Sequence, residues 1–246
     1  MIVRTEALVL KTMDFRETSR IVTFFTREYG KVKGVMKGIR KDPKKFGSNA
    51  DKFSFNDIVF YRYSRSDLHL ISQCDLRDYF FPVRQDLKKS LAASYILELV
   101  DHIMPVEEKN EDVYRLMMDF LGSLNETDDI DKLVHIFQVK ILVYSGFRPH
   151  IDSCVKTGKK IHGRAKFSPK HGGLVSLQVE VNDPEASIIS QGTVSSLLHI
   201  ESNSWQHCLK LGLINTARQE LKFLLNNFLT FHLGRRIRSA RYLQEA

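Results

Sequence analysis

The sequence lacks most features that would place a protein outside the cytosol. It has only three cysteines among 246 residues, and this odd count excludes a fully paired disulfide framework and favours a reducing compartment. No stretch of about 18 uncharged apolar residues occurs, and the first residues contain no apolar segment of the kind found in a signal peptide. The sequence therefore predicts a soluble intracellular protein.

The sequence also lacks the motifs that carry the commonest catalytic chemistries. It contains no P-loop, no dinucleotide-binding glycine pattern, no G-x-S-x-G and no H-E-x-x-H. Three histidines fall in expected helices without the spacing of a metal cluster: His199, His207 and His232. The acidic run at 128–131 suits the first turn of a helix better than a cation site, because its carboxylates have no ordered ligand spacing. We therefore predict no enzyme activity, no catalytic residue, no metal and no cofactor.

What the sequence does have is enough apolar residues for a core and an uneven distribution of charge. Hydrophobic residues make up 43% of the chain and aromatic residues 10%, which suits one large domain or two to three small ones. The net charge is +8, with +6 in residues 1–80, −4 in residues 81–150 and +6 in residues 151–246. Basic ends attract polyanions, so nucleic acid is the first partner to consider, although a solubilising surface explains the charge equally well.

Residues 1–80 have the pattern of a small β-barrel. Five segments rich in β-branched and aromatic residues alternate with turn residues, at Ile2–Lys11, Arg20–Arg27, Lys31–Ile39, Phe53–Tyr63 and Leu68–Cys74. A basic stretch with one proline and two glycines, residues 38–53, connects the third segment to the fourth, and we expect a loop there.

Most of the remaining chain has helical patterns. Asp86 is a suitable N-cap for a helix that Pro105 ends, two further apolar stripes follow at 113–124 and 130–144, and Gly146 suits the end of the third helix. Further helices are expected at Thr193–Ile200, Trp205–Leu211 and Asn215–Leu233. Residues 150–189 are polar, and we expect them to be irregular.

The basic residues of the third strand and the following loop are the strongest functional signal. Small five-stranded barrels bind single strands with a cationic groove and stacking aromatic rings. We predict base stacking by Phe46 and phosphate contacts by Lys31, Lys33, Lys37, Arg40, Lys41, Lys44 and Lys45. The alternative is that Phe53 and Phe55 face the barrel core and that the lysines only solvate the loop.

Several segments resemble those of one known family, in the same order along the chain. The opening resembles the start of the bacterial recombination mediator RecO, and it reads TEALVLKTMDFRETSRIVTFFTREYGKVKGVMKGIRK. Four later segments are similar to that family's first helix, the approach to its zinc module, the turn after this module and its C-terminal end: SYILELVDHIM, FQVKILVYSGFRPHIDSC, FSPKHGGLV and FHLGRRIRSARYL. The resemblance covers nearly the whole chain.

The resemblance implies a fold and a division into domains. We expect an α+β multidomain protein with an N-terminal five-stranded OB-fold β-barrel at residues 1–80. An α-helical domain follows at residues 81–149 and 190–246. A zinc-ribbon-like insertion interrupts this domain at residues 150–189.

The resemblance also implies a function and its partners. Members of the RecO family bind single- and double-stranded DNA, anneal complementary strands, and act with RecR, and in some bacteria RecF, to load RecA onto DNA coated by single-strand-binding protein. They also bind the acidic C-terminal tail of single-strand-binding protein. We accordingly expect a cytoplasmic, nucleoid-associated DNA repair protein without membrane contact. We add the hypothesis that basic residues near the C-terminus contact phosphates: Arg235, Arg236, Arg238 and Arg241.

The insertion departs from the family's zinc pattern. That pattern would place cysteines at positions 154, 157, 175 and 178, where this chain has Cys154, Thr157, Val175 and Gln178. Even with His162 and His171 nearby, the ligands fall short of the four that a structural zinc ion takes. We therefore expect a degenerate module in which apolar packing replaces the stabilisation by metal.

Two other functions remain open at this point. One is a non-enzymatic RNA-binding OB-fold protein, which would prefer ribo- over deoxyribo-oligonucleotides. The other is a nucleic-acid-processing enzyme, which would cleave an oligonucleotide in the presence of Mg²⁺. The absence of a metal-binding carboxylate motif counts against the second.

Overall fold

The chain forms two compact units. The structure is a computed structural model, and it describes residues 1–42, 46–47 and 50–245. The first unit comprises Met1–Leu121 and Arg238–Ala246, and the second comprises Gly122–Ile237. Each unit is described by itself below, and the domain boundaries expected from the sequence stay a prediction.

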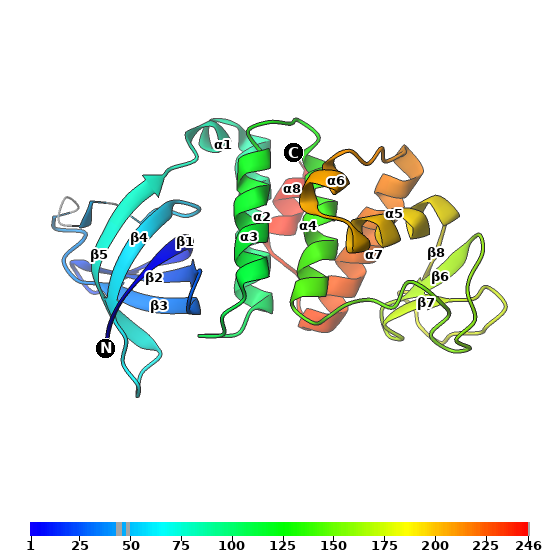
Figure 1. Cartoon of the computed structure of the whole chain (residues 1–246), viewed down its shortest axis with the longest axis horizontal. Coiled ribbons are helices and arrows are strands. Elements are labelled where there is room, and N and C mark those ends of the chain that lie inside the picture. Colours follow the sequence, from blue (N-terminus) through cyan, green and yellow to red (C-terminus); the bar gives the residue numbers. More distant parts are fainter. Residues whose placement is uncertain (43–45, 48–49, 246) are drawn as a thin grey trace. The chain divides into compact units, whose positions relative to one another are not determined.

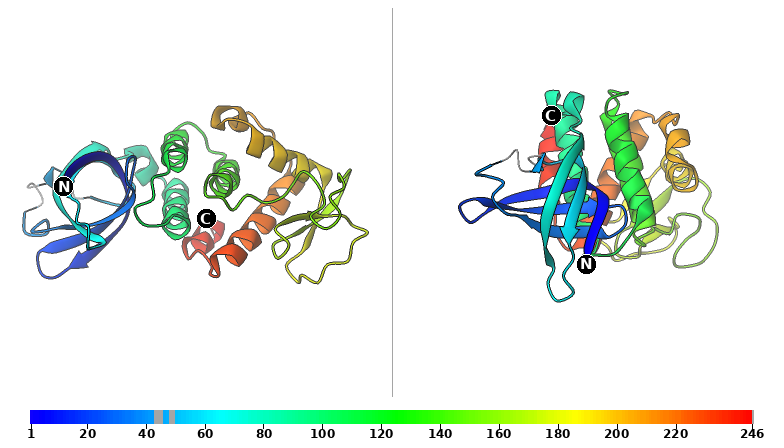
Figure 2. Two further views of the ribbon diagram at one scale, coloured as in Figure 1. Left: turned by 60° about the horizontal axis from the view of Figure 1, so that its bottom comes forward. Right: turned by 60° about the vertical axis from the view of Figure 1, so that its left-hand side comes forward.

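The first unit begins with a closed five-stranded barrel (Figures 1 and 2). Its strands follow the order β1-β2-β3-β5-β4, and all pairs are antiparallel except β3 with β5. The barrel confirms the five strands expected from the sequence and is consistent with an OB-fold. The strands are β1 (Ile2–Phe15), β2 (Ser19–Thr26), β3 (Gly30–Met36), β4 (Phe55–Tyr61) and β5 (Leu68–Asp78).

Alternation along the strands fills the barrel. On β3, Val32, Gly34 and Met36 are buried, whereas Lys33 is exposed between them, as expected when successive side chains point to opposite faces. The buried side chains form one apolar cluster, whose largest members include Phe24, Met36, Phe46, Ile58 and Phe60. The period-two pattern in the sequence is therefore the direct cause of the barrel core.

Four helices complete the first unit: α1 (Phe81–Gln85), α2 (Leu87–Ile103), α3 (Glu111–Ser123), whose last two residues belong to the second unit, and α8 (Ser239–Glu245). The Asp86 side chain caps α2 by accepting the Lys89 N–H at 2.9 Å, as the sequence predicts. Glu98 of α2 accepts the N–H groups of Arg238 and Ser239, both at 2.9 Å, and so fixes the start of α8. The sequence did not predict α1 or α8, because neither short helix carries a full apolar stripe.

The second unit is built around α4, which is buried along most of its length. This helix contacts α5, α6 and α7. Lys132 and Lys140 of α4 donate to carbonyls at the C-terminal ends of neighbouring helices, with Lys132 Nζ 2.9 Å from the Leu209 oxygen and Lys140 Nζ 3.3 Å from the Glu201 oxygen. The helices are α4 (Ile130–Tyr144), α5 (Gln191–Ser202), α6 (Trp205–Leu209) and α7 (Asn215–Leu233).

A three-stranded sheet corrects the expectation that residues 150–189 are irregular. It has the order β7-β6-β8, with β6 (Ala165–Ser168) between β7 (Gly173–Val175) and β8 (Ser187–Ile189). The sequence pattern missed these strands because each spans only three or four residues. Phe167 of β6 packs on Phe228 of α7 with ring centroids 5.6 Å apart, so the sheet shares the apolar core of this unit.

In the described part of the chain, no helix combines the length and the apolarity that crossing a lipid bilayer requires.

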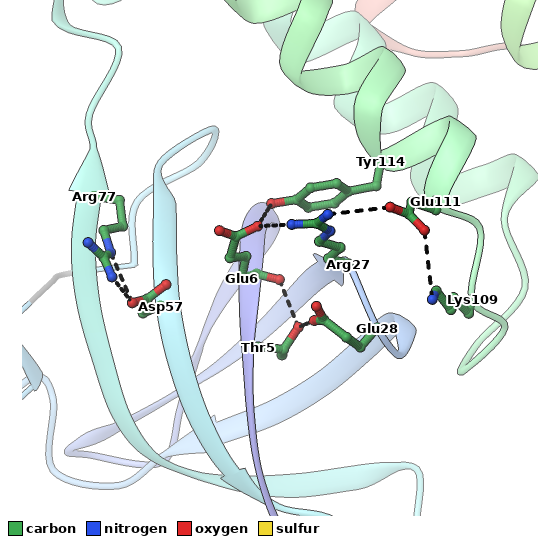
Figure 3. A network of polar contacts seen from close by, with 9 residues as sticks. All are labelled: Thr5, Glu6, Arg27, Glu28, Asp57, Arg77, Lys109, Glu111 and Tyr114. Carbon is green, nitrogen blue, oxygen red and sulfur yellow. Dashed lines mark hydrogen bonds and ion pairs between the residues drawn. The ribbon is translucent and has the colours of Figure 1, made fainter.

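A polar network joins the barrel to α3 within the first unit (Figure 3). Arg27 of the β2–β3 turn lies 3.4 Å from both Glu6 Oε2 of β1 and Glu111 Oε1 of α3. The Tyr114 hydroxyl of α3 donates to Glu6 Oε2 at 3.3 Å. Burial, followed by the adjacent Glu6 charge, raises the pKa of Tyr114, so this hydroxyl remains a donor at any physiological pH.

The segment between α2 and α3 docks on the barrel beside this network. The Glu107 N–H donates to the Lys31 oxygen at 2.9 Å, and Glu108 lies against Gly30. The Glu107 carboxylate accepts from Arg62 Nη2 and from His69 Nε2, each at 2.7 Å. Although burial acts in the opposite direction, these two hydrogen bonds lower the pKa of Glu107, so the carboxylate stays ionised.

We predict that Gly30→Ala destabilises the protein far more than Gly38→Ala. Both glycines have positive φ, of 62° and 82°, so both substitutions carry a similar backbone cost of about 1–2 kcal/mol. A Cβ at Gly30 would also lie 1.9 Å from the Glu108 oxygen, whereas nothing lies within 4 Å of a Cβ at Gly38. Displacing this backbone should cost about 1–3 kcal/mol more. Thermal unfolding of the two variants measures the difference, and equal midpoints would contradict the docking.

Candidate nucleic-acid interface

Lysines line the outer face of the barrel where β1, β2 and β3 run side by side. Lys11 of β1 pairs with Thr23 of β2, and Thr23 pairs with Lys33 of β3, so all three side chains share one face. Lys33 lies between buried residues of β3, Lys37 directly follows this strand, and both lysines are exposed. The register of the sheet therefore places Lys11 and Lys33 on the same outer surface, and exposed Lys37 follows the end of β3.

The turn after β3 is held against the β1–β2 turn. The Arg40 N–H donates to the Thr18 oxygen at 2.9 Å, and Arg40 Nη1 donates to the Arg16 oxygen at 3.1 Å. Arg40 Nε also lies 3.5 Å from Asp14 Oδ2. These contacts bring Arg16 beside Arg40, with exposed Lys41 next along the chain.

Together these residues form a surface that we call the barrel cationic surface. Asp14 compensates part of the charge on Arg40, and the same carboxylate also lies 3.3 Å from Arg20, which is not a member of the surface. The other basic side chains form no ion pair with a carboxylate among the residues that the structure describes. Their charge is therefore free to attract phosphates by releasing counterions. The members of the surface are Lys11, Arg16, Lys33, Lys37, Arg40 and Lys41.

Lys31 does not belong to this surface, although the sequence analysis included it. Its side chain is only 9% exposed, its ammonium donates to the Asp101 oxygen, and it lies 3.4 Å from Asp101 Oδ1. A lysine engaged in this way cannot reach a phosphate without breaking the contact between β3 and α2. Sequence pattern alone could not reveal this, because Lys31 follows a turn and precedes Lys33 in a basic run.

The predicted stacking by Phe46 is wrong. Its ring is 3% exposed and belongs to the apolar cluster inside the barrel. Phe53 is also buried and lies under the Arg84 guanidinium, whose carbon is 4.1 Å from the ring centroid. Of the two rings that the alternative named, Phe53 is buried and Phe55 is half-buried. Lys44 and Lys45 lie outside the described residues.

The basic residues near the C-terminus are exposed on both sides of a unit boundary. Gly234, with φ of 63°, ends α7, and Arg235 and Arg236 follow it in the second unit. Arg238 belongs to the first unit, where its N–H is held by Glu98. All three arginine side chains are exposed, and among the described residues none of these guanidinium groups forms an ion pair with a carboxylate.

Metal-binding clusters and activated nucleophiles are the arrangements that would indicate catalysis. They contain no group of three or more His, Cys, Asp or Glu side chains that could hold a metal ion. Ser168 contacts His171 Nδ1 at 2.9 Å and also donates to Asp183. This serine is fully buried, and both partners approach the same hydroxyl, so the group fixes a turn and does not form a nucleophile.

Cys154 lies in a cradle of hydrogen-bond donors. Its Sγ accepts the Ser176 N–H at 3.3 Å. Burial raises the pKa of the thiol, but hydrogen bonds from the Thr157 hydroxyl and from the N–H groups of Ser176, Lys156 and Thr157 outweigh it and bring the pKa to about 7. Val175 is buried in β7 and offers no ligand atom, so the residues present do not fit a tetrahedral zinc ion.

Family comparisons identify the chain. The family model described as Recombination protein O N terminal matches residues 1–80, and the one described as Recombination protein O C terminal matches residues 84–241. The chain belongs to the RecO family. The resemblance noted in the sequence is thereby confirmed.

Curated RecO proteins match over nearly the full length. The chain is 32% identical to DNA repair protein RecO of Syntrophus aciditrophicus over 98% of this chain and 95% of the relative. It is 30% identical to DNA repair protein RecO of Caldicellulosiruptor saccharolyticus over 96% of this chain and 95% of the relative. The protein of the same name from Bacillus pumilus is 26% identical over 100% of this chain and 94% of the relative.

The sequence of this RecO-family chain did not predict two members of the barrel cationic surface, Lys11 and Arg16. Lys11 stands at the end of the first expected strand, and only the pairing with Thr23 shows that it shares a face with Lys33. Arg16 has φ of 54° in the β1–β2 turn, and the fold of residues 37–42 over this turn brings Arg40 to it. The alternation along β3 could have shown that Lys33 faces outward while Val32 and Gly34 face the core. No local signal in the sequence pointed to Arg16.

We predict that one cysteine of this chain ionises with a midpoint near pH 7. The thiolate's ultraviolet absorbance should rise around that pH, and the rise should be absent in Cys154→Ser. Cys208→Ser is the control and should retain it, because burial raises the pKa of the Cys208 thiol. A midpoint at about 8.5, the ordinary value for a cysteine, would contradict the cradle of donors around Cys154.

Proposed function

We propose that this protein is a non-enzymatic DNA repair protein that binds DNA phosphates through the barrel cationic surface. One observation carries the proposal: sheet register places Lys11 and Lys33 on one face, the pinned turn brings Arg40 to Arg16, and most of these basic side chains have no carboxylate partner among the described residues. Binding of this kind positions the DNA backbone and does not read its sequence. Membership of the RecO family supports a role in DNA repair.

Two separate basic regions support strand annealing as the activity. Two DNA backbones repel one another, so a protein that brings them together must neutralise phosphates on both. The barrel cationic surface can hold one strand, and Arg235, Arg236 and Arg238 can hold a second strand or a duplex. Each region gains affinity by releasing counterions, which makes binding depend steeply on salt.

We infer the partners from the family. The protein acts with RecR, and in some bacteria with RecF, to load RecA onto single-stranded DNA coated by single-strand-binding protein. It also binds the acidic C-terminal tail of that protein. This role places it in the cytoplasm, in association with the nucleoid.

We also propose the domain organisation that the family implies. Residues 1–80 form the OB-fold, residues 81–149 and 190–246 form the helical domain, and residues 150–189 form a degenerate zinc-ribbon-like insertion. The donors around Cys154 Sγ support this, because N–H groups aimed at a sulfur suit a thiolate ligand. Burial of Val175 and Phe167 takes over the stabilisation that a metal would supply.

Charge reversal on the barrel should flatten the salt dependence of single-strand binding. We expect the triple variant Lys33→Glu, Lys37→Glu, Lys41→Glu to reduce the slope of log K against log salt by about two units, since each lost phosphate contact contributes about 0.7. The matched control changes Lys156, Lys159 and Lys160 to Glu and alters the net charge equally. Fluorescence anisotropy over a salt series measures both, and an equal effect in the control would refute the barrel assignment.

An annealing assay tests the proposed activity as a whole. Complementary strands coated with single-strand-binding protein should anneal faster when the protein is present, and RecR should change this rate. No acceleration with or without RecR would remove the mediator function. Tighter binding to ribo- than to deoxyribo-oligonucleotides would favour the alternative of an RNA-binding protein.

A further inference from the structure

A pocket of the first unit opens between the β4–β5 loop and the segment that joins α2 to α3. Its volume is about 690 Å³, within the usual range for ligand sites. Two serines line it together with Arg62, Tyr63, Arg65, Asp67, Val106 and Glu107. All of these residues belong to the first unit.

Hydrogen bonds fix one wall of the pocket. The Tyr63 N–H donates to His69 Nδ1 at 3.2 Å, so the ring carries its proton on Nε2 and donates to Glu107 Oε1 at 2.7 Å. Arg62 Nη2 donates to the other oxygen of the same carboxylate at 2.7 Å. His69 is fully buried, so the backbone at Tyr63 is anchored to the interior of the barrel. A wall held in this way is preorganised for a ligand.

The chemistry of the pocket suits a nucleobase. Tyr63 is 46% exposed and supplies an aromatic ring, and Val106 is 39% exposed and supplies an apolar surface. The serine hydroxyls donate and accept, and Asp67 accepts, so both kinds of groups on a base edge find partners. The charges of the pocket do not single out an anion, because the Glu107 carboxylate already engages Arg62 and Asp67 adds a negative charge beside Arg65.

One member of the barrel cationic surface lies next to the end of the loop that lines the pocket. Lys33 pairs with Leu68, the residue at which the β4–β5 loop enters β5. Lys37 lies four residues further along the same chain, about 13 Å away in extended geometry. Arg65 has no ion pair with any residue that the structure describes, so it can extend the line of cations to the rim of the pocket.

We propose that this pocket receives one unpaired base of a single DNA strand whose phosphates lie on the barrel cationic surface. The proposal rests on the DNA binding proposed above. The base stacks on Tyr63, and Arg65 contacts the adjoining phosphate. Paired bases in a duplex are already stacked and cannot enter, so the pocket gives the barrel a preference for single strands.

Binding of the full chain to an oligonucleotide carrying one 2-aminopurine tests the proposal. Tyr63→Ala should weaken single-strand binding by about 5- to 150-fold, the range for loss of one stacked base. Duplex affinity and the salt slope should not change, because the ring carries no charge. The base analogue's fluorescence should change on binding to the wild type and much less on binding to this variant. Arg65→Ala should instead reduce the salt slope by about one unit.

Three further variants make the result decisive. Tyr63→Phe keeps the ring and should bind as the wild type does. Tyr63→Leu keeps apolar volume without a ring, and it replaces the alanine variant if that variant does not fold. Phe81→Ala removes another exposed ring of this unit, 59% exposed and outside the pocket, and should have no effect.

Two outcomes would overturn the proposal, and they are distinguishable. If the wild type binds single strands and folded Tyr63→Leu binds them equally well, the pocket is not a base site, while the barrel surface stands. If the wild type binds neither single strands nor duplex, the proposed function fails and this inference fails with it.

Discussion

The Glu107 carboxylate is the contact on which this end of the barrel depends. This carboxylate accepts hydrogen bonds from Arg62, just after β4, and from buried His69 of β5. The backbone N–H of Glu107 donates to the Lys31 oxygen of β3. One residue between α2 and α3 thereby holds three strands. The backbone of Glu108 packs directly against Gly30, so any side chain at Gly30 would displace the segment between α2 and α3 from its docked position. The docked segment also forms one wall of the pocket beside the β4–β5 loop, through Val106 and Glu107.

The same docking separates two kinds of lysine on β3 and directly after it. Lys31 turns toward α2 and contacts Asp101, so it is part of the joint between barrel and helices. Lys33 and Lys37 point outward, and no described carboxylate neutralises them. A folded protein normally pairs or disperses such charges, because like charges repel one another. Gathering them on one face makes sense when a polyanion supplies the missing counter-charge.

The sequence predicted the larger elements and missed features that depend on distant residues. The five strands, the cap at Asp86 and the long helix ending at Gly234 follow from local patterns, and these patterns agree with the tertiary packing. The small sheet around Phe167 has strands too short to show a period. The burial of Phe46, the joint at Lys31 and the approach of Arg16 to Arg40 are set by contacts between segments far apart in the chain. A pattern in one sequence does not contain that information. The basic run could therefore be recognised, but the division between buried Lys31 and the exposed lysines could not.

The turn that Arg40 pins has a consequence for the energetics of recognition. Its backbone bond to Thr18 and its side-chain bond to Arg16 order residues 37–41 when the protein folds. A flexible basic loop would lose this freedom only on meeting its ligand, at a cost of about 1–2 kcal/mol for each residue that becomes fixed. Here that entropy is already lost in the free protein. Long-range attraction between Lys37, Lys41 and a passing phosphate would therefore be offset by little further ordering, which favours fast association with a polyanion.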